Sequence, residues 1–128
     1  MEIKDNQGKV VAKISAGKIC NMKGDILGRV EKGQVSDAAG KPVGFVKKTT
    51  VVGSDGEGKA LYSDKEISTY SGAAMYAFSG KTVTDYANKA VLRLSEDSNK
   101  LVEELVAYIV FFSNLWKDTS KIYTTPAY

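Results

Sequence analysis

Short stretches in which polar and apolar residues alternate recur through the first 94 residues of the chain. Five of them predict β-strands with one buried face: Glu2-Ile3-Lys4, Lys18-Ile19-Cys20, Gln34-Val35-Ser36, Glu66-Ile67-Ser68 and Thr82-Val83-Thr84. Each is followed by a turn signal of the form Asp/Asn-x-x-Gly, or a close variant of it, and then by an apolar strand. The pattern therefore predicts a series of β-hairpins.

The turn signals recur at a nearly constant spacing. We place their last residues at Gly8, Gly24, Gly40, Gly58, Gly72 and Asn88, with gaps of 16, 16, 18, 14 and 16 residues. Asp or Asn at the first place of a turn can bond its own downstream backbone, and Gly or Asn at the fourth accepts a positive φ. This chemistry is typical of a type I turn with a G1 bulge, and six such turns indicate an internal repeat.

Two columns of apolar residues follow the turns and do not fit a simple strand. Three places after the turn position stand Val11, Leu27, Val43, Leu61, Met75 and Val91. Six places after it stand Ile14, Val30, Val46, Phe78 and Leu94, with Asp64 as the exception. Strict alternation would put these columns on opposite faces of a strand. Either a bulge reverses the facing, or both faces are partly covered, for instance by a partner subunit.

The chain changes character after residue 95. All twelve glycines lie within the first 80 residues, and every residue from 105 to 112 is apolar. We predict a helix over residues 96–118, capped by Ser95 or Ser98, and a tail over 119–128. A helix that is apolar around its whole circumference is buried on all sides. The hairpins of residues 1–95 must then wrap around it within a single domain, 1–128.

A size estimate leaves the number of hairpins open. Ten tilted strands give a barrel roughly 20 Å across and twelve give about 24 Å. A central helix needs the surrounding backbone about 10 Å from its axis, so ten strands fit well and twelve fit loosely. The predicted fold class is mainly β, with short β-hairpin repeats forming a closed or nearly closed ring or barrel around a hydrophobic C-terminal α-helix.

Tandem hairpins of the form Asp-x-x-Gly-Lys-x-Val-Gly-x-Val resemble the short repeats of five-fold β-flower proteins. The resemblance covers residues 2–94, and a five-fold ring would leave the sixth hairpin, Asp85–Leu94, as a connector to the helix. The plan of six hairpins followed by a helix also looks like the tubby-like barrel, although the strands here are far shorter. The β-flower resemblance implies no activity, whereas the tubby-like one implies binding to phosphoinositides or a membrane surface.

Composition excludes several kinds of chemistry. The 128 residues contain no histidine and one cysteine, Cys20. Ser-His-Asp and Cys-His catalysis, imidazole metal sites and intramolecular disulfides are therefore excluded. The acidic stretch Asp55-Gly56-Glu57-Gly58 lacks the spaced ligands of an EF-hand loop, and we interpret it as an ordinary turn. We expect a protein that is not an enzyme, with no catalytic residue, metal or cofactor.

The net charge of +3 hides an uneven distribution. Residues 1–95 carry 15 Lys/Arg and 10 Asp/Glu, a balance of +5, and residues 96–128 carry 3 and 5, a balance of −2. Basic residues that recur with the repeat predict an anion-binding face, with Lys13, Arg29, Lys47, Lys48 and Arg93 as its candidates. An anionic lipid headgroup or a glycan would suit this face, whereas the mild total charge disfavours nucleic acid. The alternative is charge that protects exposed strand edges from pairing.

The leading interpretation is a non-enzymatic structural or protein-interaction module that self-associates through a protruding helix end. Its candidate surface contains Leu115, Trp116 and Tyr123. Binding of an anionic surface or ligand by the basic face of the repeats is the alternative function.

The sequence also bears on membranes and location. The longest apolar run has eight residues, fewer than the roughly 18–20 needed to span a bilayer, so we expect no transmembrane segment. The first residues contain no apolar core of a signal peptide. The expected location is the cytoplasm by default, or outside it if a leader that is absent here directs export.

Overall fold

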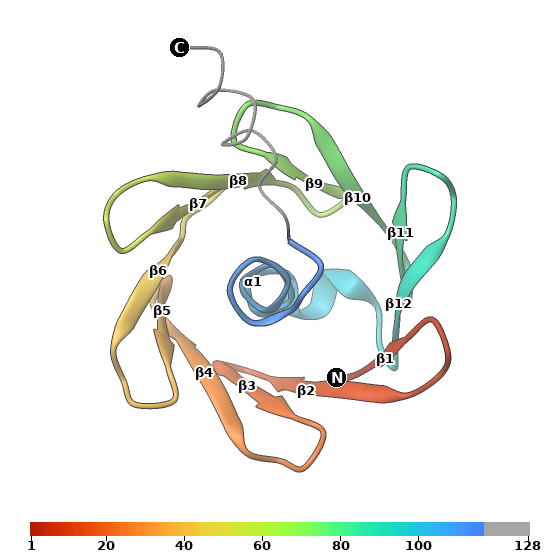
Figure 1. Cartoon of the computed structure of the whole chain (residues 1–128), viewed down its shortest axis with the longest axis horizontal. Helices are drawn as coiled ribbons and strands as arrows, with labels where there is room; N and C mark the ends of the chain where they lie inside the picture. The colour runs from red at the N-terminus through yellow and green to blue at the C-terminus, as the bar shows by residue number, and fades with distance from the viewer. Residues whose placement is uncertain (117–128) are drawn as a thin grey trace.

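Twelve antiparallel β-strands form a closed barrel around a helix in a computed structural model that describes residues 1–116 (Figure 1). Each strand pairs with its neighbours in sequence, and β12 closes the ring on β1. The strands are β1 (Glu2–Asp5), β2 (Val10–Ser15), β3 (Lys18–Asn21), β4 (Ile26–Glu31), β5 (Gln34–Asp37), β6 (Pro42–Val46), β7 (Thr50–Gly53), β8 (Gly58–Tyr62), β9 (Glu66–Thr69), β10 (Ala74–Ser79), β11 (Thr82–Asp85) and β12 (Ala90–Leu94). The predicted fold class is confirmed, and the sixth hairpin belongs to the ring rather than serving as a connector.

Six hairpins project outward from the barrel (Figure 1), and we call them petals 1 to 6. They are the strand pairs β1–β2, β3–β4, β5–β6, β7–β8, β9–β10 and β11–β12. In petal 3, Asp37 Oδ1 accepts the backbone N–H groups of Ala39 and Lys41 at 3.0 and 2.9 Å. Asn21 Oδ1 accepts two backbone N–H groups at the same place in petal 2. These bonds explain why Asp or Asn opens the turn.

The repeat is more regular than the glycine spacing suggests. The fourth turn ends at Gly56, with φ of 83°, and not at Gly58, which begins β8. Its closing bond runs from Gly56 N–H to the carbonyl of Gly53, as Gly8 N–H bonds Asp5 in petal 1. Gly53 thus stands where most of the other turns have Asp or Asn. The sequence-based prediction instead began this turn at Asp55, two residues later. The turns then end at residues 8, 24, 40, 56, 72 and 88, a constant period of 16.

A β-bulge in every petal explains the two apolar columns. In petal 1, Ile3 pairs with Ala12 and Lys4 pairs with Val10, so Val11 is the extra residue of the bulge. The register shifts at the same place in all six petals. Because a bulge bends its strand, the outer half of each petal turns away from the barrel. With the corrected turn, Lys59 replaces Leu61 in the bulge column, and Tyr62 replaces the exception Asp64 in the inner column.

The inner wall of the barrel is built from the repeat. One residue of each odd-numbered strand is completely shielded from solvent: Ile3, Ile19, Val35, Val51, Ile67 and Val83. The even-numbered strands contribute the buried inner column Ile14, Val30, Val46, Tyr62, Phe78 and Leu94. The large rings of Tyr62 and Phe78 help to fill a twelve-stranded barrel, which an all-aliphatic wall would fit loosely around a helix.

The central helix is shorter than the sequence predicts. It consists of the 3₁₀ turn η1 (Ser98–Leu101), α1 (Val102–Ala107) and the π-helical turn η2 (Tyr108–Phe112). Asp97, and neither Ser95 nor Ser98, caps its start by accepting the Asn99 N–H at 3.0 Å. Ser113 is extended, so the helix ends at Phe112, and residues 113–116 are not helical. Leu105 through Ile109 are buried inside the barrel, as their apolar run predicts.

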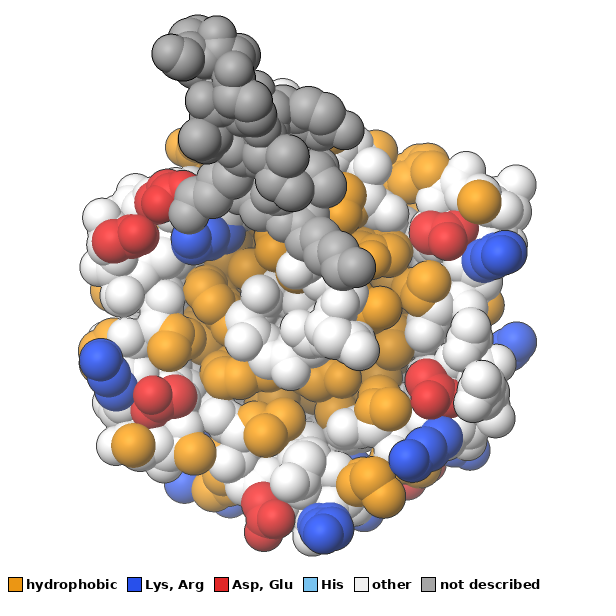
Figure 2. Space-filling view, viewed as in Figure 1, with side chains coloured by type: hydrophobic (Ala, Val, Ile, Leu, Met, Phe, Trp, Pro, Cys, Tyr) orange, Lys and Arg blue, Asp and Glu red, His pale blue; other side chains and the backbone are white. Residues whose placement is uncertain are grey.

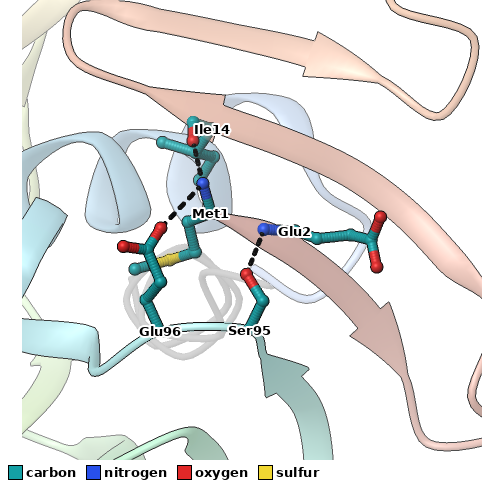
Figure 3. Close-up of polar contacts among 5 residues, drawn as sticks. All are labelled: Met1, Glu2, Ile14, Ser95 and Glu96. Carbon is teal, nitrogen blue, oxygen red and sulfur yellow. Dashed lines mark hydrogen bonds and ion pairs between the residues drawn. The ribbon is translucent and has the colours of Figure 1, made fainter.

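Polar contacts seal the place where the last strand meets the first (Figure 3). The Glu2 N–H donates to Ser95 Oγ at 2.7 Å, and the Ser95 N–H donates to the Glu2 carbonyl at 3.0 Å. The ammonium group of Met1 lies 3.1 Å from a Glu96 carboxylate oxygen and donates to the Ile14 carbonyl. The helical segment therefore begins a few residues after β12, the strand that closes the ring on β1.

Candidate interaction surfaces

The end of the helix is held against one side of the barrel by two glycines. A Cβ atom at Gly28 would lie 2.3 Å from Cζ of Phe112, and one at Gly44 would lie 2.4 Å from Cζ of Phe111. Both glycines occupy the repeat position at which Ala12 and Ala60 point into the core. The missing methyl groups of β4 and β6 thus make room for the two phenyl rings.

The helix end lies at the centre of an apolar face, which we call the mouth. It contains partly buried residues of the bulge column, Val11, Leu27, Val43 and Val91, together with Phe111, Phe112, Leu115 and Trp116. Figure 2 shows hydrophobic side chains in a ring around the centre of this face, with charged side chains farther out. The mouth is therefore an apolar surface inside a charged rim.

The predicted helix-end residues lie in the mouth, but the helix itself does not carry them outward. Leu115 and Trp116 follow the last helical residue and pack against the core. The Tyr76 hydroxyl donates to the Leu115 carbonyl at 2.7 Å, and the Leu115 N–H donates to Ser113 Oγ at 3.1 Å. Tyr123, the third predicted residue of this surface, lies outside the described residues.

The rim carries charges of both signs. Three petals place Asp and Lys four residues apart, as Asp5 and Lys9, Asp37 and Lys41, and Asp85 and Lys89. Petal 2 carries Lys23 and Asp25, and petal 4 carries Asp55, Glu57 and Lys59. Acidic and basic groups thus alternate around most of the mouth.

The predicted anion-binding residues separate into two groups. Lys13, Arg29 and Arg93 are exposed and occupy one repeat position on the outer wall of the barrel, on β2, β4 and β12. Lys47 and Lys48 instead lie in the turn between β6 and β7. Lys13, Arg29 and Arg93 therefore form one row on the outer wall, and Lys47 and Lys48 lie outside this row.

Two further lysines, Lys4 and Lys18, complete a basic band on this wall. Lys4 pairs directly with Arg93 across β1 and β12, and Lys18 pairs with Arg29 across β3 and β4. Hollows of about 210 and 290 Å³ lie beside these pairs. Within residues 1–116, none of the four cations forms an ion pair. We call Lys4, Lys13, Lys18, Arg29 and Arg93 the basic band.

The other half of the same row is apolar. Phe45, Leu61 and Ala77 occupy the repeat position of Lys13 on β6, β8 and β10, and Phe45 is 37% exposed. The strict 16-residue period would have revealed this row, but the misplaced fourth turn assigned Leu61 to the bulge column instead. This row of the outer wall thus has a basic half and an apolar half.

The side-chain pKa values of three tyrosines that contact the interior are raised. Burial raises the pKa of Tyr108, and it also raises the pKa of Tyr62, to which the nearby Glu103 carboxylate adds. The pKa of Tyr76 is raised by burial and then by Asp85. These hydroxyls are therefore neutral hydrogen-bond donors at neutral pH.

The described residues contain no grouping of three His, Cys, Asp or Glu side chains that could hold a metal ion. The acidic stretch of petal 4 is a turn in which Asp55 Oδ1 accepts the Glu57 N–H at 2.9 Å. No helix within residues 1–116 has both the length and the apolar character needed to cross a bilayer.

These features define a class of protein, a closed barrel of six bulged hairpins around a central helix. The 4-fold beta flower family matches residues 1–71, more than half of the chain, and the chain belongs to this family. The matched residues contain four of the six turns. The ring has six petals, and the five-fold arrangement of the resemblance is not confirmed. This is not a known family of enzymes. No curated protein and no solved structure matches the chain, and the tubby-like resemblance gains no support.

Proposed function

We propose that this protein is a non-enzymatic structural module that associates with a second copy of itself through the mouth. The observation that carries the proposal is the partly exposed apolar surface around the helix end (Figure 2). Contiguous apolar patches on soluble domains commonly mark interaction sites.

The charged rim favours a second copy as the partner. A petal tip that carries both an aspartate and a lysine can face the same tip of another molecule with opposite charges in register. A two-fold axis brings identical surfaces together, so a self-complementary rim suits a symmetric dimer. The apolar mouth would supply the buried centre of such an interface, and the petals its polar border.

The test compares two substitutions on the same strand. Val43→Asp places a charge in the mouth, whereas Phe45→Asp places it on the outer wall, two residues along β6. In light scattering across a concentration series, we expect the unsubstituted protein and Phe45→Asp to dimerise. Val43→Asp should weaken dimerisation by at least tenfold, because an unpaired charge would be desolvated at the interface.

A strictly monomeric protein at high concentration would overturn self-association. Equal dimerisation of the two variants would show that an interface exists elsewhere. Circular dichroism of both variants checks that each barrel is folded.

Binding of an anionic lipid headgroup or glycan by the basic band is a second candidate function. Two like-charged residues directly opposite one another across strands destabilise a sheet. Within residues 1–116, no ion pair to a carboxylate offsets this cost at the Lys4–Arg93 and Lys18–Arg29 pairs, although Glu2 and Glu31 line the hollows beside them. The clustering of these cations on one part of the wall supports a role for the positive charge.

A further inference from the structure

A cavity of about 380 Å³ opens in the mouth between the helix end and the strands that close the ring. Its apolar wall is formed by Val11 and Val91 of the bulge column, the inner-wall residue Leu92, and Phe112 and Leu115 at the helix end. This volume lies within the range of small-molecule sites, roughly 300–1,000 Å³. The rings of Phe111 and Phe112 lie toward Gly44 and Gly28, and among residues 1–116 a hollow remains on the side of β12 and β1.

The polar groups of this cavity are neutral or negative. Asp5, Tyr108 and Asn114 line it, and among residues 1–116 no lysine or arginine does. Asp5 Oδ1 accepts the N–H groups of Gln7 and Lys9, while its other oxygen has no partner within residues 1–116. The Tyr108 hydroxyl forms no hydrogen bond to the described residues, and burial raises its pKa. One carboxylate oxygen and one neutral hydroxyl are thus left to bind a ligand.

The helix adds to the negative character of the cavity. A helix carries partial negative charge at its C-terminal end, where the last carbonyl groups lack intrahelical partners. Phe112, the last helical residue, and Ser113 both line the cavity. The carboxylate of Asp5 and the C-terminal end of the helix would therefore both attract a bound positive charge.

We infer that this cavity binds a small organic cation with an apolar body, in the class of the alkyl primary ammonium ions. The apolar wall would cover the alkyl chain, and the ammonium group would donate hydrogen bonds to Asp5 and to the oxygen of Tyr108. The inference goes beyond self-association and does not depend on it. The binding test is run at a concentration where light scattering shows monomers.

The test compares three probes with the same alkyl chain: n-hexylammonium, 1-hexanol and hexanoate. Binding is followed by NMR titration of the backbone amides, and the expected shifts are at Val11, Leu92 and Asn114. We expect hexylammonium to bind roughly fivefold to tenfold more tightly than hexanol, and hexanoate to bind least. Equal affinities for the three probes, the reverse order, or no binding at millimolar concentrations would overturn the inference.

One substitution isolates the carboxylate. Asp5→Asn removes the charge and preserves the turn, because Asn21 makes the same two bonds in petal 2. We expect it to reduce the preference for hexylammonium over hexanol at least roughly threefold and to leave hexanol binding unchanged. Asp37→Asn, the same substitution in petal 3, should alter neither affinity. A preference that survives Asp5→Asn would overturn the assigned role of Asp5, even if the cavity binds all three probes.

Discussion

Gly28 and Gly44 show how a single missing side chain positions an element far away in sequence. Both lie in strand interiors, where glycine weakens a sheet because it has no side chain to pack and loses more backbone entropy. Neither has a positive φ, so a left-handed backbone conformation does not explain them. A Cβ atom would instead meet two neighbours at each position, a phenyl ring of the helix end and a carbonyl oxygen of the adjacent strand, Ser36 beside Gly28 and Val52 beside Gly44. The two glycines thus leave the space that the phenyl rings at the helix end occupy.

We predict that Gly28→Ala destabilises the protein by about 1–3 kcal/mol, because the added methyl group would overlap the Phe112 ring and the Ser36 carbonyl oxygen. The measurement is the free energy of unfolding in urea. The reciprocal substitution Ala12→Gly, at the same repeat position, should cost about 1–2 kcal/mol, from backbone entropy and from the loss of one buried methyl group.

A second variant tests the cause of this effect. The double substitution Gly28→Ala, Phe112→Leu should cost less than the sum of its parts, since the smaller side chain relieves the overlap. Additive costs, or a Gly28→Ala protein as stable as the original, would contradict the explanation that Gly28 makes room for the Phe112 ring.

At the scale of the element, the helix is stable because of where it lies. Fifteen residues in three kinds of helical turn would be marginal as an isolated helix. Inside the barrel, Leu105 and Ile109 are completely shielded from solvent. The wide π turn at its end carries Tyr108 into the wall of the cavity. Burial of this hydroxyl makes the stability of the helix in its barrel depend on pH.

We predict that alkaline conditions unfold the protein partly through Tyr108. The pKa of Tyr108 is raised in the folded protein above its ordinary value of about 10, so the unfolded chain loses this proton first. The resulting stability is complete below pH 10 and is lost as the pH rises through the folded value. Tyr108→Phe should therefore flatten the fall of unfolding free energy above pH 10.

The control is Tyr70→Phe, at a tyrosine that is 51% exposed. Urea titrations at pH 7 and between pH 9.5 and 11 separate the two variants. An unchanged alkaline slope in Tyr108→Phe would contradict the assignment, and at pH 7 its stability should stay within about 1 kcal/mol of the original.

At the scale of the whole molecule, ring closure completes a row on the outer wall that has a basic half and an apolar half. The same repeat position carries Arg93, Lys13 and Arg29 on one side and Phe45, Leu61 and Ala77 on the other. Arg93 joins the other two only because β12 pairs with β1. A charge asymmetry of this kind can be selected for binding even when it reduces stability.

We predict that Lys18→Glu raises stability and weakens anion binding together. The substitution replaces a like-charged pair with Arg29 by an opposite pair, which should add roughly 0.2–1 kcal/mol to the unfolding free energy. Binding to a sulfated glycan or to anionic vesicles at low salt should fall several-fold. Calorimetry measures the first effect, and co-sedimentation or a glycan array measures the second.

The matched control for this experiment is Lys48→Glu, which changes charge equally but lies in the turn beyond the basic band. It should affect binding much less than Lys18→Glu. Binding that ignores salt, or that survives Lys18→Glu, would exclude the basic band as the anion site.

Much of the fold could be predicted from neighbouring residues, but the site could not. The hairpins follow from Asp/Asn and Gly at fixed offsets, because these residues act on the backbone within four positions. The fourth turn was misplaced because Asp55 bonds locally much as the other aspartates do, although Gly53 holds their place. The repeat places Lys13, Arg29 and Arg93 in one row, whereas Lys47 and Lys48 lie in the turn between β6 and β7. The cavity gave no sequence signal, because its lining comes from the two ends of the described chain.

The sequence by itself determined the repeating hairpins, the apolar helix and the enclosure of one by the other. Local turn chemistry suffices for the hairpins, because it acts between residues close together in the chain. The enclosure follows because a helix that is apolar all round must be buried and only the hairpins can cover it. Only the tertiary structure decided that six petals close the ring, where the helix ends, and which side of the barrel receives it. These outcomes depend on packing between Gly28 and Phe112 and on pairing between β1 and β12, contacts whose geometry exists only when the ring is closed.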